Sequence, residues 1–129
     1  MTINCKGNLL DLSTPKVMGI INITPDSFYD GGKYEDETEI IAQVEIMLAN
    51  GASFIDIGAY SSRPGAKYVD ENEELARIIP IVKLLLKTFP NVLISIDTFR
   101  SRVADECLAL GAAIINDISA GNLDPKMME

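Results

Sequence analysis

This sequence of 129 residues contains no histidine, no tryptophan and only two cysteines. Without histidine, the chain has no imidazole metal ligand and no Ser-His or Cys-His nucleophile pair. Cys5 and Cys107 lack the spacing of metal ligands. Cys107 falls in an apolar helical pattern, which favours a small buried hydrophobic residue. Metal sites and catalytic pairs built on histidine are therefore excluded.

Basic residues are scarce, since 11 Lys and Arg face 19 Asp and Glu, giving a formal net charge of −8. A chain this acidic is not expected to bind nucleic acid. No apolar run approaches the roughly 18 residues of a membrane span, and the first residues lack a basic-then-apolar signal pattern. No glycine-rich phosphate motif of the Rossmann or P-loop type is present. We expect a cytoplasmic protein that binds neither nucleic acid nor membranes, although a small anionic substrate is compatible with this charge.

Hydrophobic residues make up 47% of the chain and charged residues 23%, as in a globular domain. Runs rich in β-branched residues predict strands buried on both faces, at 17–21, 54–57, 92–96 and 113–115. Apolar residues at helical spacing predict helices between these strands, around 40–48, 75–86 and 103–108. The alternation predicts a parallel α/β fold with right-handed crossovers.

Local signals predict where the helices begin and end. Asp36 with Glu39, and Asp70 with Glu73, have the spacing of capping pairs. Gly51 and Gly111 are expected to end the first and third helices. Pro80 lies within the second apolar stripe, so we expect a kink or break near it.

Two architectures fit this order of elements: an open doubly wound sheet, or part of a (β/α)₈ barrel. A full barrel needs roughly 250 residues, so four strands and three helices make about half of one. We treat 1–129 as one domain, with a lead segment 1–16 that contains a strand or hairpin. Residues 121–129 resemble the cap and first turn of a fourth helix, which suggests a truncated chain.

Polar residues follow the predicted strands at the point where each strand ends. They are Asn22, Gly58, Asp97 and Asn116. Ligands bind at the carboxyl ends of the strands in both architectures. Asp56 lies within an apolar run, where a carboxylate is costly unless it is paired. Paired donors and acceptors of Asp and Asn suit a flat heterocycle.

Each of these residues also has a purely structural interpretation. Asp56 could bond backbone amides at its strand end, and Asp97 could cap a helix together with Thr98. Asn22 and Asn116 could be turn residues.

Two loops have compositions typical of binding segments. The loop 22–32 combines Pro, Asp, Ser, two aromatic residues and two Gly, and loops of this length are often lids. The segment 61–65 offers hydroxyls, a guanidinium and a Pro-Gly turn, which suit an anion or carboxylate. Plain surface connections are the alternative for both loops.

These motifs resemble the dihydropteroate synthase family. The segment Met18–Phe28, followed by Asp30-Gly31-Gly32, is similar to its first signature. Asp56-Ile57-Gly58 through Ser62-Arg63-Pro64-Gly65-Ala66 is similar to the second, and 94–98 and 115–118 are similar to its next two strand ends. The resemblance implies a TIM barrel of the pterin-binding type. It also implies condensation of 6-hydroxymethyl-7,8-dihydropterin diphosphate with p-aminobenzoate, the reaction that sulfonamides target, giving 7,8-dihydropteroate and diphosphate.

The resemblance also implies residue roles. Asn22 matches the asparagine that helps hold Mg²⁺ and diphosphate, and Asp97 and Asn116 match the residues that bind the pterin. Asp56 occupies a matching position and is a further candidate for substrate binding. The resemblance extends to the loops, where Asp26, Phe28 and Arg63 are the catalytic candidates, and Ser62, Arg63 and Pro64 lie beside the p-aminobenzoate site. Ser62 stands where the family usually has threonine, so the hydroxyl remains and a methyl group is lost.

The family has further essential groups in the second half of its barrel, including another pterin-binding aspartate and cations that grip diphosphate. We therefore expect this chain to be the amino-terminal half of the enzyme and inactive alone, with a homodimer formed by the full-length enzyme. Two alternatives stay open: a non-catalytic half-barrel module, and a pterin-barrel methyltransferase that binds methyltetrahydrofolate. The loops at 24–28 and 62–65 favour the synthase.

Overall fold

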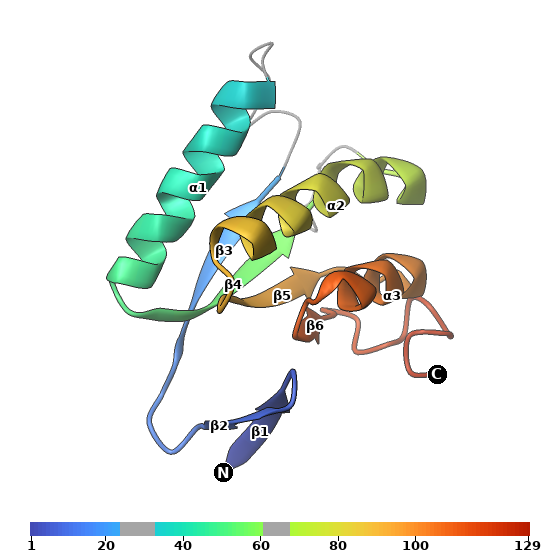
Figure 1. Ribbon diagram of the computed structural model, residues 1–129. Coiled ribbons are helices and arrows are strands. Elements are labelled where there is room, and N and C mark those ends of the chain that lie inside the picture. The colour runs from blue at the N-terminus through green and yellow to red at the C-terminus, as the bar shows by residue number, and fades with distance from the viewer. Residues whose placement is uncertain (24–32, 61–67) are drawn as a thin grey trace.

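A computed structural model describes residues 1–23, 33–60 and 68–129 of the chain (Figure 1). The elements follow the predicted order, with a two-stranded hairpin ahead of alternating strands and helices. They are β1 (Thr2–Cys5), β2 (Asn8–Asp11), β3 (Val17–Asn22), α1 (Lys33–Ala49), β4 (Ala52–Gly58), α2 (Glu71–Thr88), β5 (Leu93–Asp97), α3 (Ser101–Leu110) and β6 (Ile114–Asn116). The four predicted strands and three predicted helices are confirmed, as is the hairpin in the lead segment. No helix in the described ranges is long and apolar enough to cross a membrane.

The main sheet is parallel, and its strands lie side by side in the order β3-β4-β5-β6. A doubly wound sheet reverses its strand order at a switch point, whereas the strands of a barrel follow one another around the axis. The sequential order therefore favours part of a barrel over the open sheet.

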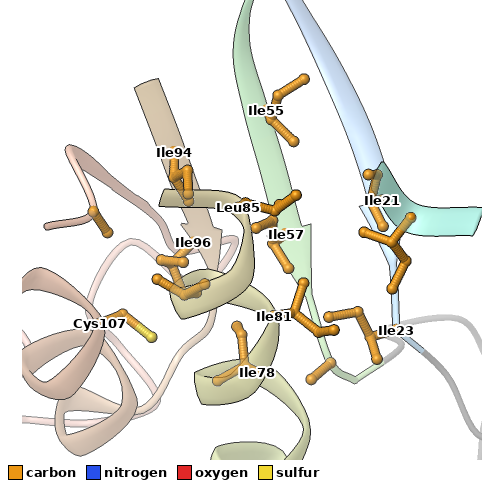
Figure 2. Packing of buried hydrophobic residues seen from close by; sticks show 14 of the residues in the cluster. Ile21, Ile23, Ile55, Ile57, Ile78, Ile81, Leu85, Ile94, Ile96 and Cys107 are labelled. Atoms are coloured by element: carbon orange, nitrogen blue, oxygen red, sulfur yellow. The ribbon is translucent and has the colours of Figure 1, made fainter. Parts of the chain in front are cut away.

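The core fills one face of this sheet. Ile21, Ile57 and Ile96 lie level on three neighbouring strands and are almost completely buried. They pack with side chains of all three helices, among them Val44 of α1 and Cys107 of α3 (Figure 2). Since α1, α2 and α3 all cover the same face, the arrangement is that of a barrel wall with its outer layer of helices.

Gly19 leaves room for the end of the Met47 side chain between α1 and β3. A β-carbon at this position would lie 2.6 Å from Sδ of Met47, which is closer than two atoms can pack. A larger residue here would require the Met47 side chain to move.

The opposite face of the sheet is buried at Phe54, Asp56 and Ser95 but carries exposed apolar side chains along β3. Met18 and Ile20 alternate with the core residue Ile21, and Ile20 is 60% exposed. In a closed barrel this face would be the filled interior, because inward and outward side chains alternate along every strand.

The helix ends confirm most of the predicted caps. The Asp70 side chain accepts a hydrogen bond from the Glu73 amide at 2.8 Å and so caps α2. Gly51 and Gly111 follow the ends of α1 and α3 with positive φ angles of 102° and 122°. Burial raises the pKa of the Cys107 thiol to about 12, consistent with the predicted buried hydrophobic residue.

One prediction about the helices is wrong, and of the kink or break expected at Pro80 the break does not occur. Asp36 does not cap α1, because that helix begins at Lys33 and includes Asp36. Pro80 does not break α2, which continues from Glu71 to Thr88. Pro80 and Ala76 both lie on the exposed side of α2, so water can satisfy the carbonyl group that proline leaves without a donor.

The expected start of a fourth helix is also absent. Residues 121–129 form hydrogen-bonded turns, in which the Met127 amide donates to the carbonyl oxygen of Asp124. The Asp124 side chain instead binds the start of α3, because its Oδ2 accepts a hydrogen bond from the Ser101 amide at 2.7 Å. This contact caps α3, whose own N-cap residue, Arg100, makes no side-chain capping bond.

We expect a protein of these 129 residues to self-associate, because the exposed Met18 and Ile20 and the outer edges of β3 and β6 favour contact with other chains. Sedimentation velocity should show species heavier than the 14.1 kDa monomer. Ile20→Asp should shift the protein toward monomer, whereas Ile46→Asp, at a helix position that is 61% exposed, should not. A compact wild-type monomer with cooperative unfolding would contradict this expectation.

Candidate active site at the carboxyl ends of the strands

The polar residues predicted at the strand ends come together in one row across the sheet. Asn22 lies level with Gly58, Gly58 with Asp97, and Asp97 with Asn116. We call these four residues the rim row. Parallel strands bring their carboxyl ends to the same edge, so the row marks the end of the sheet where ligands bind in barrels.

Asp56 lies beneath the rim row, because residues two apart on a strand share a face. Its side chain is only 3% exposed. Oδ2 accepts a hydrogen bond from Asn116 Nδ2 at 3.3 Å, and Oδ1 has no partner among the described residues. Ser95 is level with Asp56 on β5, and its buried Oγ likewise lacks a partner within the described chain. Two buried oxygens on adjacent strands thus lack a partner within the described residues, and buried polar atoms are usually bonded to protein or to ordered water.

Asp97 is half-buried at the end of β5. Its Oδ1 accepts a hydrogen bond from the Tyr60 hydroxyl at 3.4 Å. Burial, and then the charge of Asp56, raise the pKa of Asp97 to about 6. The alternative that Asp97 caps a helix is wrong, because the N-cap position of α3 is Arg100.

Gly58 gives the Asp97 side chain the space that it occupies. A β-carbon on Gly58 would lie 3.3 Å from both Cβ and Oδ2 of Asp97. Such contacts are tighter than ordinary packing, so a larger residue would push the carboxylate away from its place in the rim row.

An ion pair buried behind the rim row was not predicted from the sequence. Glu74 of α2 is 0% exposed, and its carboxylate accepts from Arg100 Nη1 and Thr98 Oγ1, each at 2.7 Å. Arg100 also donates to the carbonyl oxygen of Val69 at 2.8 Å. The pair joins α2 to the segment between β5 and α3, and removing one partner from such a pair costs about 3–5 kcal/mol. The signal was available, since Glu74 falls one turn before Ile78 on the core side of α2.

Five predicted site residues lie outside the described ranges. They are Asp26 and Phe28 in the segment 24–32, and Ser62, Arg63 and Pro64 in the segment 61–67. The first segment comes shortly after β3 and the second shortly after β4, and these two strands pair in parallel. Their ends stay together, because the Ile23 amide donates to the carbonyl oxygen of Gly58 at 2.7 Å. The predicted roles of the five residues stay predictions.

Asn22, the predicted ligand of Mg²⁺, is exposed at the end of β3 and offers one amide oxygen. The described residues contain no group of three or more His, Cys, Asp or Glu side chains that could hold a metal ion. Mg²⁺ usually keeps several waters and binds through few protein oxygens plus the phosphates of a substrate. Asn22 therefore fits an ion held chiefly by diphosphate and not one enclosed by protein.

Comparison with known proteins agrees with this geometry. A family model described as pterin binding enzyme matches residues 18–129. The chain is 50% identical over 111 residues to dihydropteroate synthase of Bacillus subtilis strain 168, covering 86% of this chain and 39% of that protein.

Two solved structures share the fold. Dihydropteroate synthase of Xanthomonas albilineans with 4-aminobenzoic acid matches at a TM-score of 0.84 and 40% identity, covering 95% of this chain and 45% of that one. The Yersinia pestis enzyme, in a sulfonamide drug complex, matches at a TM-score of 0.82 and 45% identity, covering 95% and 44%. The chain thus spans less than half of the relatives that it matches, and the predicted fold of about half a TIM barrel is confirmed.

Asp97→Asn should stabilise the protein at neutral pH. The pKa of Asp97 is raised from 3.8 to about 6 in the folded state, so the folded chain binds more protons than the unfolded chain between these values. Asp97 therefore lowers the free energy of unfolding as pH rises from about 4 to about 6. Melting temperatures should be higher for Asp97→Asn than for wild type at pH 7 and similar at pH 3.5. Asp105→Asn, on the exposed side of α3, is the matched control. A melting temperature of Asp97→Asn below that of wild type at pH 7 would contradict a raised pKa of Asp97 in the folded state.

Proposed function

Since the chain belongs to the pterin-binding enzyme family, we propose that it takes part in the dihydropteroate synthase reaction. In this reaction the amine nitrogen of p-aminobenzoate attacks the methylene carbon of 6-hydroxymethyl-7,8-dihydropterin diphosphate. The new C–N bond replaces the C–O bond to diphosphate, which leaves with the bonding electron pair, and the amine loses a proton. The products are 7,8-dihydropteroate and diphosphate.

The rim row is the observation that carries this proposal. A pterin ring presents N–H donors and ring acceptors along one flat edge, and carboxylate and amide groups supply the complementary acceptors and donors. Asp97 and Asn116 lie level on adjacent strands, and beneath them is Oδ1 of Asp56, which has no partner among the described residues. We propose that all three bind the pterin, and that Asp97 does so as the carboxylate.

The nucleophile suits a chain without histidine. An aniline nitrogen is already neutral near pH 7, so its attack needs no strong base. The difficult step is departure of the anionic diphosphate, which cationic side chains and a metal ion can stabilise. When bound, Mg²⁺ would neutralise the charge that develops on diphosphate, with Asn22 as one of its ligands.

The second substrate is assigned to the loops. We propose that Ser62, Arg63 and Pro64 lie beside p-aminobenzoate, and that Asp26 and Phe28 act from the loop after β3. The solved relatives with 4-aminobenzoic acid and with a sulfonamide support a site of this chemistry. A cytoplasmic location and a homodimer of the full-length enzyme belong to the same proposal.

The chain spans 39% to 45% of the synthases that it matches, so catalysis is best tested in a full-length setting. We expect a chimera, in which these residues replace the matching part of the Bacillus subtilis enzyme, to form dihydropteroate. Asp97→Asn in this chimera should weaken binding of the pterin diphosphate by about tenfold or more, because a charged hydrogen-bond acceptor is lost. Isothermal titration calorimetry measures the affinity.

Asp105→Asn is again the matched control and should bind as the parent chimera does. A folded chimera that binds methyltetrahydrofolate but not the pterin diphosphate would favour the methyltransferase alternative. Pterin affinity within twofold of the parent in Asp97→Asn would show that Asp97 does not bind the pterin.

A further inference from the structure

Tyr60 lies two residues after the end of β4 and reaches across to β5. Its hydroxyl donates a hydrogen bond to Oδ1 of Asp97 at 3.4 Å. We infer that Tyr60 is a positioning residue of the rim row, which holds one oxygen of the Asp97 carboxylate so that the other faces the ligand. The identity of that ligand rests on the proposed function, whereas the effect of Tyr60 on Asp97 does not.

The Tyr60 ring is itself held in place. It meets the ring of Phe99 edge-on, with centroids 5.2 Å apart and an angle of 88° between the planes. The guanidinium of Arg100 lies 4.7 Å from the centroid of Phe99. Arg100 is fixed in turn by buried Glu74 and by the carbonyl oxygen of Val69. A continuous series of contacts therefore runs from the buried ion pair to the hydroxyl that binds Asp97.

The two oxygens of Asp97 have different surroundings. Oδ1 accepts from Tyr60, while Oδ2 lies on the side of Gly58, within 3.3 Å of the point where a β-carbon would stand. The missing side chain at Gly58 leaves space beside Oδ2. The hydrogen bond from Tyr60 to Oδ1 restrains rotation of the carboxylate plane and leaves Oδ2 on the side of Gly58, the neighbour of Asp97 in the rim row.

The hydrogen bond from Tyr60 acts on the pKa of Asp97 in the opposite direction to burial and to the acidic groups nearby. Asp56 on β4, Glu74 on α2 and Asp117 after β6 all raise the pKa of Asp97, as burial does, and the bond from Tyr60 opposes them. Burial and the charge of Asp97 hold the pKa of Tyr60 well above its usual range, so the phenol stays protonated and remains a donor. Tyr60 thus favours the ionised form of Asp97 against three acidic neighbours.

The test is a titration of the Asp97 carboxyl carbon by NMR in the 129-residue chain and its Tyr60→Phe variant. Phenylalanine keeps the ring and its edge contact with Phe99 but removes the donor. We expect the midpoint of Asp97 to rise from about 6 by roughly half a unit. Tyr68→Phe is the matched control, because the Tyr68 ring lies 5.8 Å from the Arg100 guanidinium and is part of the same surroundings. In Tyr68→Phe the titration midpoint of Asp97 should stay at the wild-type value.

A second variant, Phe99→Leu, keeps the hydroxyl and removes its aromatic support. It should raise the Asp97 midpoint by a smaller amount, and it gives a result even if Tyr60→Phe fails to fold. An unchanged midpoint in folded Tyr60→Phe, or in folded Phe99→Leu if the first variant does not fold, would overturn the inference.

The chimera described above separates this inference from the proposed function. If the role of Tyr60 and the proposed function both hold, pterin diphosphate binding should weaken below the pH at which Asp97 becomes protonated. Tyr60→Phe should raise that pH together with the titration midpoint of Asp97. A shifted midpoint in a chimera that binds no pterin would support the role of Tyr60 and contradict the proposed function. Pterin binding with an unchanged midpoint would support the proposed function and overturn the role of Tyr60.

Discussion

Side chains of neighbouring parallel strands lie level with one another, and residues two apart on a strand share a face. In this sheet, that register sends Ile21, Ile57 and Ile96 toward the helices and leaves the following residue of each strand, Asn22, Gly58 or Asp97, on the opposite face. The same strands therefore build the core and the rim row. A slip of one residue in register would bury the polar set and expose the core. Both the stability of the fold and the chemistry of its edge depend on this single constraint.

Asp97 in the rim row is costly to hold, because Asp56 beneath the row brings a second carboxylate close to it. Asp56 is almost fully buried, and its charge helps to raise the pKa of Asp97. Carboxyl groups with perturbed pKa values are common at sites where a protein binds a ligand. The Glu74–Arg100 pair lies behind the row and fixes the segment that follows β5. The arrangement thus combines a rigid support with carboxylates whose hydrogen-bonding capacity is left for a partner.

Much of this could be predicted from sequence, because strands and their ends have strong local signals. Asp97 and Asn116 follow apolar runs directly, and their meeting at one edge follows from the parallel order of the strands. Contacts between distant segments have no such signal: Tyr60 meets Asp97 across 37 positions of the chain. Glu74 stands on the core side of an apolar stripe, but its partner could not be chosen without the fold. The break considered at Pro80 does not occur, because exposure to water, which offsets the missing donor, is a tertiary property.

We propose that the carboxyl ends of the strands bind a pterin. The most direct measurement is a map of ¹H–¹⁵N chemical shifts in the 129-residue chain titrated with 6-hydroxymethylpterin. We expect changes concentrated at Gly58, Asp97 and Asn116, including the side-chain amide of Asn116 that donates to Asp56. Changes confined to the opposite end of the sheet, around Asn91 and Val92, or no change at saturating ligand, would contradict this proposal.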